Sequence, residues 1–397
     1  MIQLISRWGK EIDPGNILQE YPRPNLVRDS YFNLNGKWEC RINESETADF
    51  YDETIIVPFS PESMLSGVGK IVMPHQRLHY RKKFTLPEGF KKSRVLLHFG
   101  AVDQECSVFV NGIRVGGHKG GYLPFHFDIT DSLRQGENVL TLSVTDRTEQ
   151  SPHARGKQKL QKKGKYASLF YTPQSGIWKT VWMESVEKAY IEDVRITPLY
   201  DDSSVRFEIT VLNACKTSGA ETSGGKASGG ETSGTVRLAV LDRGVEIGQA
   251  EITVRQEKEI KQVISQEIKL DGFKPWTPDT PHLYDVIIRY GEDEVRSYFG
   301  MRKLSTGRDG KGILRFFLNN KPYFFNGILD QGYWPESLMT APSDEALVYD
   351  IIKLKEMGYN TIRKHVKIEA ERFYYHCDRL GMMVWQDMPN GGGEYNM

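Results

Sequence analysis

The sequence contains few cysteines. Only four occur in 397 residues, and no two of them form a C-x-x-C pair; they are Cys40, Cys106, Cys215 and Cys377. Cysteines scattered in this way exclude a dense disulfide framework and give no zinc-binding signature, so we expect no metal site. We predict that all four are buried free thiols.

The chain also lacks an excess of charge of either sign. Lys and Arg together number 52, and Asp and Glu also number 52, which gives a net charge of zero. This balance argues against a nucleic acid or an anionic membrane surface as the main partner. No apolar run approaches the length of a transmembrane helix. Met1 to Ser6 does not resemble a signal peptide, so a cytoplasmic location and, after removal of a leader, a periplasmic one both stay open.

The length and the aromatic content bound the architecture. A chain of 397 residues is too long for one ordinary core, so we expect two or three domains. Aromatic residues are plentiful, with 19 Tyr, 18 Phe and 7 Trp. Such residues form carbohydrate-binding faces, and they also fill the cores of β-sandwiches, which is the more common use.

Residues 1–187 are predicted to form a jelly-roll β-sandwich. Short alternating segments read as strands at residues 80–86, 94–99, 106–110 and 139–144, and Asn111-Gly112 is a strong hairpin signal. The basic run at 157–165 is predicted to be a solvated loop, although a polyanion site is the alternative. Residues 171–178 either deliver a last strand or form a rim loop that leans on a neighbouring cleft.

Residues 188–303 are predicted to form an immunoglobulin-like β-sandwich. Its expected strands lie at residues 194–198, 204–212, 235–241, 250–254 and 283–290. Between two of them, residues 216–235 form a Gly/Ser/Thr tract that cannot bury apolar surface. We therefore expect a mobile hairpin loop there.

Residues 304–397 carry the pattern of a parallel α/β fold. Strands are predicted at 323–329, 360–366 and 382–386. A helix capped by Ser343 and closed by Gly358 separates the first two strands, with Ala346, Leu347, Ile351, Leu354 and Met357 on its apolar face. A second helix at 369–380 ends at Gly381. The pattern predicts the first three βα units of an incomplete (β/α)8 barrel, and the whole chain is therefore multidomain and mainly β.

Polar and aromatic residues follow the ends of these three strands. They are Asp330, Gln331, Trp334, Arg363, His365, Asp387 and Asn390. The carboxyl ends of parallel strands hold the active site in barrel enzymes, so we predict that these seven residues bind substrate.

Several stretches resemble glycoside hydrolase family 2, which contains β-galactosidases, β-glucuronidases and β-mannosidases. In the first segment they are Glu20-Tyr21-Pro22-Arg23-Pro24, Leu34-Asn35-Gly36-Lys37-Trp38, Phe99-Gly100-Ala101-Val102-Asp103, Val108-Phe109-Val110-Asn111-Gly112 and Ser175-Gly176-Ile177-Trp178. Further along they are Trp276-Thr277-Pro278, Pro281-His282-Leu283-Tyr284 and Phe299-Gly300-Met301-Arg302. The likeness covers nearly the whole chain, in the domain order of the family.

The resemblance implies a retaining exo-β-glycosidase that acts through two glutamates. In the family these glutamates follow later barrel strands, so we expect no catalytic residue within this chain and no hydrolysis by it alone. Glu394 is interpreted as a loop residue. Arg363 matches a family arginine that orients a carboxylate or a sugar hydroxyl, and a structural salt bridge is the equal alternative. Asp387 matches an acidic residue that accepts sugar hydroxyl groups, with a helix cap as the alternative.

The sequence departs from the β-galactosidase pattern at two histidines. His365 stands one place before the family histidine, and Gln331 occupies the place of another. A shift of one residue turns a side chain to the other face of a strand, so His365 replaces the family histidine only if the strand ends differently. Trp385-Gln386-Asp387 is closer to β-mannosidase-like members.

The expected partner is a β-linked oligosaccharide or glycoside, and no cofactor is expected. A half-built barrel would expose apolar faces and an open sheet edge, which predicts a homo-oligomer formed through this region. The alternative to an enzyme is a carbohydrate-binding or interaction protein that catalyses nothing.

Overall fold

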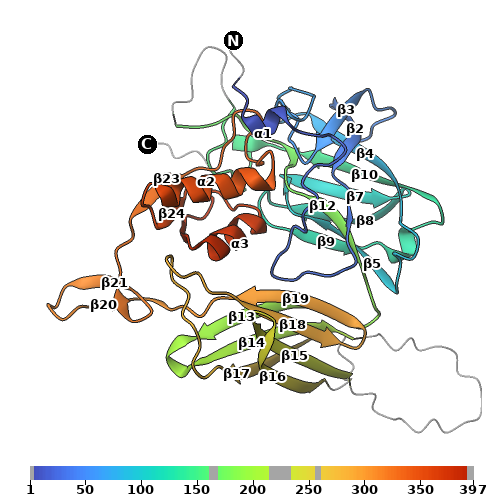
Figure 1. Cartoon of the computed structure of the whole chain (residues 1–397). Helices are drawn as coiled ribbons and strands as arrows, with labels where there is room; N and C mark the ends of the chain where they lie inside the picture. Colours follow the sequence, from blue (N-terminus) through green and yellow to red (C-terminus); the bar gives the residue numbers. More distant parts are fainter. Residues whose placement is uncertain (1–3, 161–168, 214–233, 255–260, 391–397) are drawn as a thin grey trace, which may run out of the picture.

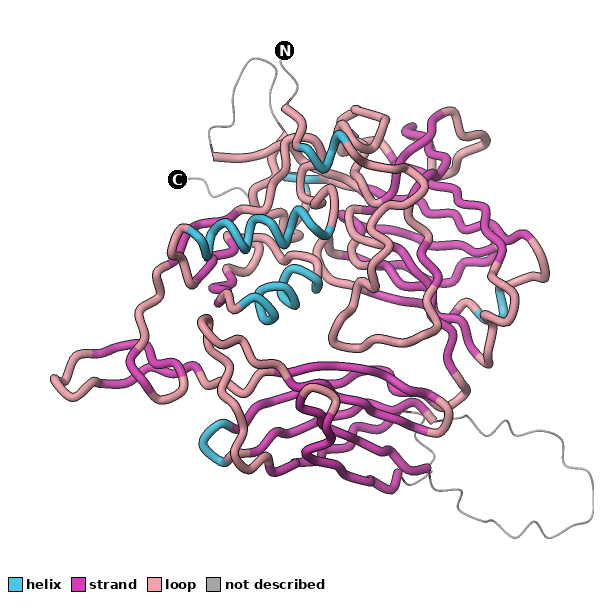
Figure 2. The backbone as a smooth tube through the Cα atoms, viewed as in Figure 1, coloured by secondary structure: helices cyan, strands magenta, loops and turns pink. Residues whose placement is uncertain are grey.

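The computed structural model describes residues 4–160, 169–213, 234–254 and 261–390. Within these residues the chain is mainly β, with two sandwiches followed by a small parallel sheet flanked by helices (Figures 1 and 2). This confirms the predicted fold class. The predicted mobile loop at 216–235 lies outside the described residues, except for its last two, which belong to a strand.

The first sandwich packs a four-stranded sheet on a six-stranded sheet. The four-stranded sheet has the order β1 (Phe32–Asn33), β12 (Val181–Val186), β5 (Arg94–Phe99) and β9 (Phe125–Asp128). The six-stranded sheet has the order β3 (Glu53–Val57), β2 (Gly36–Asn43), β4 (Arg77–Thr85), β10 (Glu137–Thr145), β7 (Glu105–Val110) and β8 (Ile113–Lys119). Alternate residues of β7 and β10 point inward, because successive side chains of a strand face opposite sides. Their apolar side chains join Trp38 and Phe99 in one core.

The turn between β7 and β8 is the hairpin predicted from Asn111-Gly112. Both residues have positive φ, 53° and 80°, as a tight hairpin turn of the primed type requires. The Asn111 side chain also accepts a hydrogen bond from the Val139 N–H at 2.9 Å. The turn is therefore tied to the neighbouring strand β10.

The second sandwich packs a three-stranded sheet on a four-stranded sheet. The three-stranded sheet has the order β13 (Tyr190–Leu199), β14 (Ser204–Leu212) and β17 (Lys261–Lys269). The four-stranded sheet has the order β16 (Val245–Val254), β15 (Gly234–Asp242), β18 (Tyr284–Tyr290) and β19 (Asp293–Phe299). The five predicted strands are all present, and β17 and β19 were not predicted. Both unpredicted strands carry charged side chains on their outer face, which weakens the apolar signal in the sequence.

A short strap near the amino terminus, Leu26 to Arg28, belongs physically to the second sandwich. Leu26 is buried in its core. Val27 exchanges two backbone hydrogen bonds with Arg296 of β19, at 2.8 and 2.9 Å. We propose to place the domain boundaries at 187/188 and 303/304, as the sequence suggested, with this strap assigned to the second sandwich.

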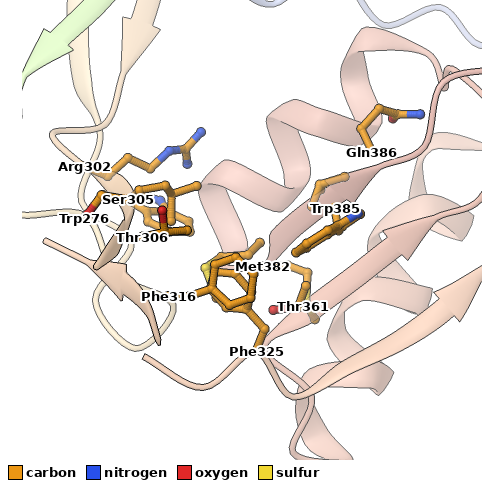
Figure 3. Close-up of a pocket in the computed structure, with 13 residues that line it drawn as sticks. Trp276, Arg302, Ser305, Thr306, Phe316, Phe325, Thr361, Met382, Trp385 and Gln386 are labelled. Carbon is orange, nitrogen blue, oxygen red and sulfur yellow. The ribbon is translucent and has the colours of Figure 1, made fainter. Parts of the chain in front are cut away.

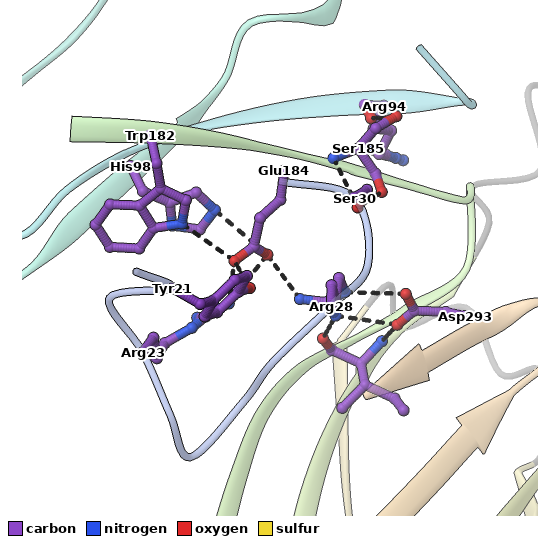
Figure 4. A network of polar contacts seen from close by, with 11 residues as sticks. Tyr21, Arg23, Arg28, Ser30, Arg94, His98, Trp182, Glu184, Ser185 and Asp293 are labelled. Carbon is purple, nitrogen blue, oxygen red and sulfur yellow. Dashed lines mark hydrogen bonds and ion pairs between the residues drawn. The ribbon is translucent and has the colours of Figure 1, made fainter. Parts of the chain in front are cut away.

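Arg28 joins the two sandwiches through buried ion pairs (Figure 4). Its Nε lies 2.9 Å from Asp293 of β19, and one Nη lies 2.8 Å from Glu184 of β12. Glu184 also accepts hydrogen bonds from Arg23, at 3.0 Å, and from the Tyr21 hydroxyl. Burial alone would raise the pKa of Glu184, but the cations around it hold the pKa well below its usual range.

The parallel sheet follows a small antiparallel hairpin. The hairpin consists of β20 (Leu304–Arg308), β21 (Leu314–Leu318) and β22 (Lys321–Pro322). The parallel unit contains β23 (Gly327–Asp330), α2 (Asp344–Glu356), β24 (Thr361–Lys364), α3 (Glu371–Leu380) and β25 (Met383–Gln386). Ser343 caps α2 and Gly381 closes α3 in a left-handed conformation, as predicted.

Three predictions about this unit are wrong. The second strand covers only Thr361–Lys364, so His365 and Val366 lie beyond its end. The first strand covers only Gly327–Asp330, and residues 323–326 form a loop. The side-chain amide of Asn326 donates to the Gly358 carbonyl at 2.9 Å, and that of Asn360 donates to the Phe324 carbonyl at 3.0 Å. These side-chain hydrogen bonds take the place of backbone pairing between strands. Met357 is 70% exposed, because α2 ends at Glu356 and its apolar face ends with it.

Three of the four cysteines, Cys40, Cys106 and Cys377, are buried free thiols, as predicted. Cys215 lies outside the described residues. None of the described helices is long and apolar enough to cross a membrane.

Candidate site at the strand ends

The register of the parallel sheet sorts the strand-end residues onto two faces. Leu329, Arg363 and Trp385 are paired across the three strands and form one row. Asp330, Lys364 and Gln386 form the next row, which faces the other way because side chains alternate along a strand. The first row is open, with Leu329 50% and Trp385 47% exposed. The second faces the helices, where the Lys364 ammonium lies 4.1 Å from the Phe373 ring.

Arg363, His365 and Asp387 come together on the open face. Asp387 Oδ2 accepts from Arg363 at 2.9 Å from Nε and 2.8 Å from Nη2, and it lies 4.0 Å from His365 Nε2. Burial lowers the pKa of His365, the charges of Lys157 and Arg363 lower it further, and Asp387 opposes them. The imidazole is therefore neutral at pH 7, and it lies on the same side as Arg363 despite its shifted place in the sequence.

Asp330 lies on the helix-facing row. Its carboxylate accepts from the Lys364 ammonium at 2.6 Å and from the Gly332 N–H at 2.7 Å. Its carbonyl oxygen accepts from the His365 N–H at 2.8 Å. The structure thus joins Asp330 to the backbone of His365 but directs its carboxylate away from Arg363 and Asp387.

A buried ion cluster behind the strand ends was not predicted. Glu369 Oε1 accepts from Lys364 at 2.9 Å and from Lys367 at 2.5 Å. Lys367 also donates to the Gly332 and Met339 carbonyls, at 2.6 and 2.7 Å. The cluster ties the loop after β23 to the loop after β24. Its only signal in the sequence is three charges within Lys364-His365-Val366-Lys367-Ile368-Glu369.

Burial and charge compete inside this cluster. Burial alone would raise the pKa of Glu369, but Lys364 and Lys367 lower it to about 2. Burial lowers the pKa of Lys367 to about 8, against the attraction of Glu369. At neutral pH both groups are charged. A side chain at position 332 would collide with Glu369 and both lysines, and Gly332 has a φ of +64°, so glycine is required there.

The loops after β23 and β25 hold the remaining predicted residues. The Trp334 ring makes an edge contact with Trp8 at 6.0 Å, and its backbone pairs with Leu338. Gln331 Oε1 is buried and has no hydrogen-bond partner in the described structure. The carbonyl oxygen of Asn390 accepts from the Arg155 and Gly156 N–H groups, at 3.1 and 2.9 Å. Glu394 lies outside the described residues.

The jelly roll contacts the loops at these strand ends. Tyr171 stacks on Tyr333, with ring centroids 3.9 Å apart and an angle of 15°. Lys179, buried in the jelly roll, donates to the carbonyls of Tyr122 and Glu369, both at 3.1 Å. Both interpretations of residues 171–178 hold: the segment leads through Gly176–Ile177 into β12, and Tyr171 contacts the loop of the neighbouring unit.

An apolar cavity of about 590 Å³ lies between the β20–β21 hairpin and the edge strand β25 (Figure 3). Its aromatic walls come from three separate segments. Trp276 precedes the second sandwich's last strands, Phe316 belongs to β21, and Phe325 and Trp385 belong to the parallel unit. Phe316 and Phe325 stack with centroids 4.9 Å apart, and the edge of Trp385 meets both. Among the described residues no group of His, Cys, Asp and Glu could hold a metal ion.

These two sandwiches and the parallel unit define a family 2 glycosidase architecture. The sugar-binding domain of the glycosyl hydrolases family 2 matches residues 67–181, and a second family 2 domain matches residues 189–302. The chain belongs to glycosyl hydrolase family 2.

Individual relatives extend this finding. The chain is 30% identical to a β-galactosidase of Thermoanaerobacter pseudethanolicus, over 78% of its own length and 39% of that protein. It is 22% identical to a β-glucuronidase of Streptococcus agalactiae, over 94% and 59%. The crystal structure of a family 2 β-galacturonidase from Eisenbergiella tayi, bound to galacturonate, superposes with a TM-score of 0.72 at 21% identity, over 94% and 60% of the two chains. The chain thus spans about two to three fifths of these relatives.

Proposed function

We propose that this chain is the amino-terminal part of a retaining exo-β-glycosidase and forms one wall of its sugar pocket. The observation that carries the proposal is the meeting of Arg363, His365 and Asp387 at the carboxyl ends of parallel strands. Support comes from the relatives, which are named as β-galactosidase, β-glucuronidase and β-galacturonidase. The reaction is the hydrolysis of the O-glycosyl bond of a terminal β-glycoside.

The open-face residues suit the recognition of sugar hydroxyl groups. Asp387 has acceptor capacity left beside Arg363, and the neutral His365 can present Nε2 as a donor or as an acceptor, because its Nδ1 is buried. Arg363 keeps a 55% exposed side chain, so its remaining N–H groups can orient a sugar hydroxyl or a second carboxylate. Gln331, Trp334 and Asn390 extend this wall on the loops. Asp330 acts from behind, by holding Lys364 and the backbone of His365.

The catalytic pair of the enzyme is assigned to residues outside this chain. A retaining glycosidase needs two free carboxyl groups about 5–5.5 Å apart, one on each side of the scissile bond. Of the carboxylates at these strand ends, Asp330 is held by Lys364, Glu369 by two lysines and Asp387 by Arg363. We therefore propose that the 397-residue chain binds a sugar without hydrolysing it.

The test uses the 397-residue protein with a panel of nitrophenyl β-glycosides. We expect no turnover, and clear turnover by the purified chain would refute the assignment of the catalytic pair. Sugar binding is measured by saturation-transfer NMR with the matching methyl β-glycosides. We expect Arg363→Ala to abolish the signal. Arg315→Ala, which removes an arginine paired with Asp309 in the exposed hairpin, is the matched control and should bind normally.

A further inference from the structure

A second cavity, of about 140 Å³, lies between the jelly roll and the parallel unit. Its walls are mostly apolar and include the rings of Trp178, Trp182 and Tyr374. Lys179 of the jelly roll lines it, and so does Glu371, the first residue of α3. None of the residues proposed to bind the sugar lines this cavity. Since a cavity of about 150 Å³ admits benzene, this one has room for a ligand of about six non-hydrogen atoms.

Two backbone groups fix the end of the Lys179 side chain at this cavity. Its Nζ donates to the carbonyl oxygens of Tyr122 and Glu369, both at 3.1 Å, and lies 4.5 Å from the centre of the Trp178 ring. Gly100 leaves room for the stem, because a Cβ at position 100 would come within 2.7 Å of Lys179 Cβ. The two carbonyl oxygens take up both N–H groups of a neutral amine and leave its lone pair free.

Lys179 lacks the carboxylate partner that two neighbouring buried lysines have. Lys364 and Lys367 both donate to Glu369 Oε1, at 2.9 and 2.5 Å. Among the residues that the structure describes, Lys179 forms no ion pair, and the acceptors of its Nζ are carbonyl oxygens. Burial lowers the pKa of Lys179 to about 7, against the attraction of Glu369. At pH 7 about half of this amine is neutral, against roughly one in 3,000 for a lysine at the ordinary value of 10.5.

Two unpartnered carboxyl groups line the same cavity. Glu371 Oε2 and Glu20 Oε2 are buried and have no hydrogen-bond partner in the described part of the chain. Burial raises the pKa of Glu371, so this group keeps its proton to a higher pH than an exposed glutamate. The two groups disfavour a ligand that carries a negative charge. Pro124, on the wall beside them, is exposed, so the cavity reaches the surface.

We propose that Lys179 is a covalent binding site for small neutral aldehydes, which it holds as a Schiff base in this cavity. The amine attacks the carbonyl carbon, and one N–H proton passes to the carbonyl oxygen, which gives a carbinolamine. Glu371 protonates the hydroxyl group, which leaves as water, and then takes the second N–H proton from the iminium. One amine and one aldehyde thus give one imine and one water, without an oxidant or a reductant. The site is independent of the proposed sugar site.

The experiment treats the 397-residue protein at pH 7 with a limiting amount of glycolaldehyde and traps the imine with cyanoborohydride. Peptide mass mapping then locates the adducts. We expect Lys179 to be modified at least about tenfold faster than the buried, paired Lys364 and the exposed, paired Lys353. The amino-terminal amine, which titrates near about 8, shows that the reagent is active. Modification of Lys179 no faster than that of the other two lysines overturns the proposal.

Two variants and a charged probe test the separate parts of the proposal. Glu371→Gln should slow adduct formation about fivefold. Glu345→Gln, at an exposed glutamate in the first turn of α2, is the matched control and should change nothing. An equal rate in both variants overturns the role of Glu371 in proton transfer. Glyoxylate, an anionic aldehyde of similar size, should leave Lys179 unmodified, and equal modification by both aldehydes overturns the restriction to neutral ligands.

Lys179→Arg keeps the positive charge but removes the amine, so it should lose this adduct and keep that of the amino terminus. An adduct that persists unchanged in the peptide containing position 179 overturns the assignment to Lys179. The mapping of the parent protein requires no substitution, so it decides the proposal even where the arginine variant fails to fold.

Discussion

Lys367 shows how a single buried cation can hold two loops. Its side chain is 2% exposed and bonds Glu369 and two carbonyl oxygens from the loop after β23. We expect Lys367→Met to lower the free energy of unfolding by about 3–5 kcal/mol, because Glu369 would lose a partner inside the protein. Urea unfolding measures the change. Lys353→Met removes an exposed lysine paired with Glu356 and should leave the free energy of unfolding nearly unchanged, because an exposed ion pair contributes little. Equal losses in the two variants would contradict the prediction.

Lys179 predicts how stability depends on pH. Burial lowers its pKa to about 7, whereas an unfolded lysine titrates near its ordinary value of 10.5. Between these two values the unfolded chain binds more protons, so stability rises with pH, by at most about 1.4 kcal/mol per pH unit. Lys179→Met should reduce the gain between pH 7.5 and pH 9.5 in urea unfolding. The same gain in both proteins would show that Lys179 keeps its proton when folded.

At the scale of elements, the amino-terminal cap of α2 makes a contribution to stability that can be measured separately. Ser343 Oγ accepts from the Ala346 N–H at 3.2 Å. Ser343→Ala should lower the free energy of unfolding by about 1 kcal/mol, and Ser343→Asp should retain most of it, because aspartate caps equally well. Thermal unfolding of both variants measures the change. An aspartate variant as unstable as the alanine variant would show that the cap contributes nothing.

The elements that could be predicted from the sequence are those set by residues that act on their own neighbours in the chain. Asn111-Gly112, Ser343 and Gly381 act through their own backbone neighbours, so the turn, the cap and the helix end were predictable. The strand expected at 323–329 was shortened by the amides of Asn326 and Asn360, which meet only in the fold. The strands β17 and β19 escaped notice because their outer faces are charged.

The candidate site, too, can be predicted from the sequence only in part. The grouping of Arg363 with Asp387 follows from parallel strands of known direction, and a sequence pattern is enough to suggest it. The separation of Asp330 from that group depends on the register of β23 against β24, which the sequence does not define. The partners of Lys367 depend on contacts between distant segments. No local pattern encodes those contacts.

At the scale of the whole molecule, Arg28 should couple the two sandwiches. Its side chain is 3% exposed and pairs with both Glu184 and Asp293. Arg28→Met leaves two buried carboxylates short of a partner, so we expect a loss of about 3–5 kcal/mol and two resolved calorimetric transitions in place of one. Arg296→Met breaks the exposed pair with Asp29 at the same junction and should leave the transition unchanged. A single transition in the Arg28 variant would contradict coupling by this residue.

The open face of the parallel sheet should drive self-association. Leu329 and Trp385 expose about half of their side chains there, and β23 and β25 are edge strands of the described three-stranded sheet. Sedimentation velocity should show a concentration-dependent dimer that Trp385→Gln weakens. Val263→Gln, at a 65% exposed site on β17, is the control. A monodisperse monomer at every concentration would refute the prediction.

The strap at Leu26 to Arg28 has a consequence for biosynthesis. Arg28 leaves the ribosome 265 residues ahead of Asp293, its partner in β19. At bacterial to eukaryotic elongation rates this gap lasts roughly 13 to 53 s. During that time Leu26 has no complete core to enter, and the Arg28 guanidinium lacks Asp293, although its other partner, Glu184, is translated earlier. The strap can therefore take its final place only after β19 has been translated, and we expect Leu26 to stay accessible to chaperones until then.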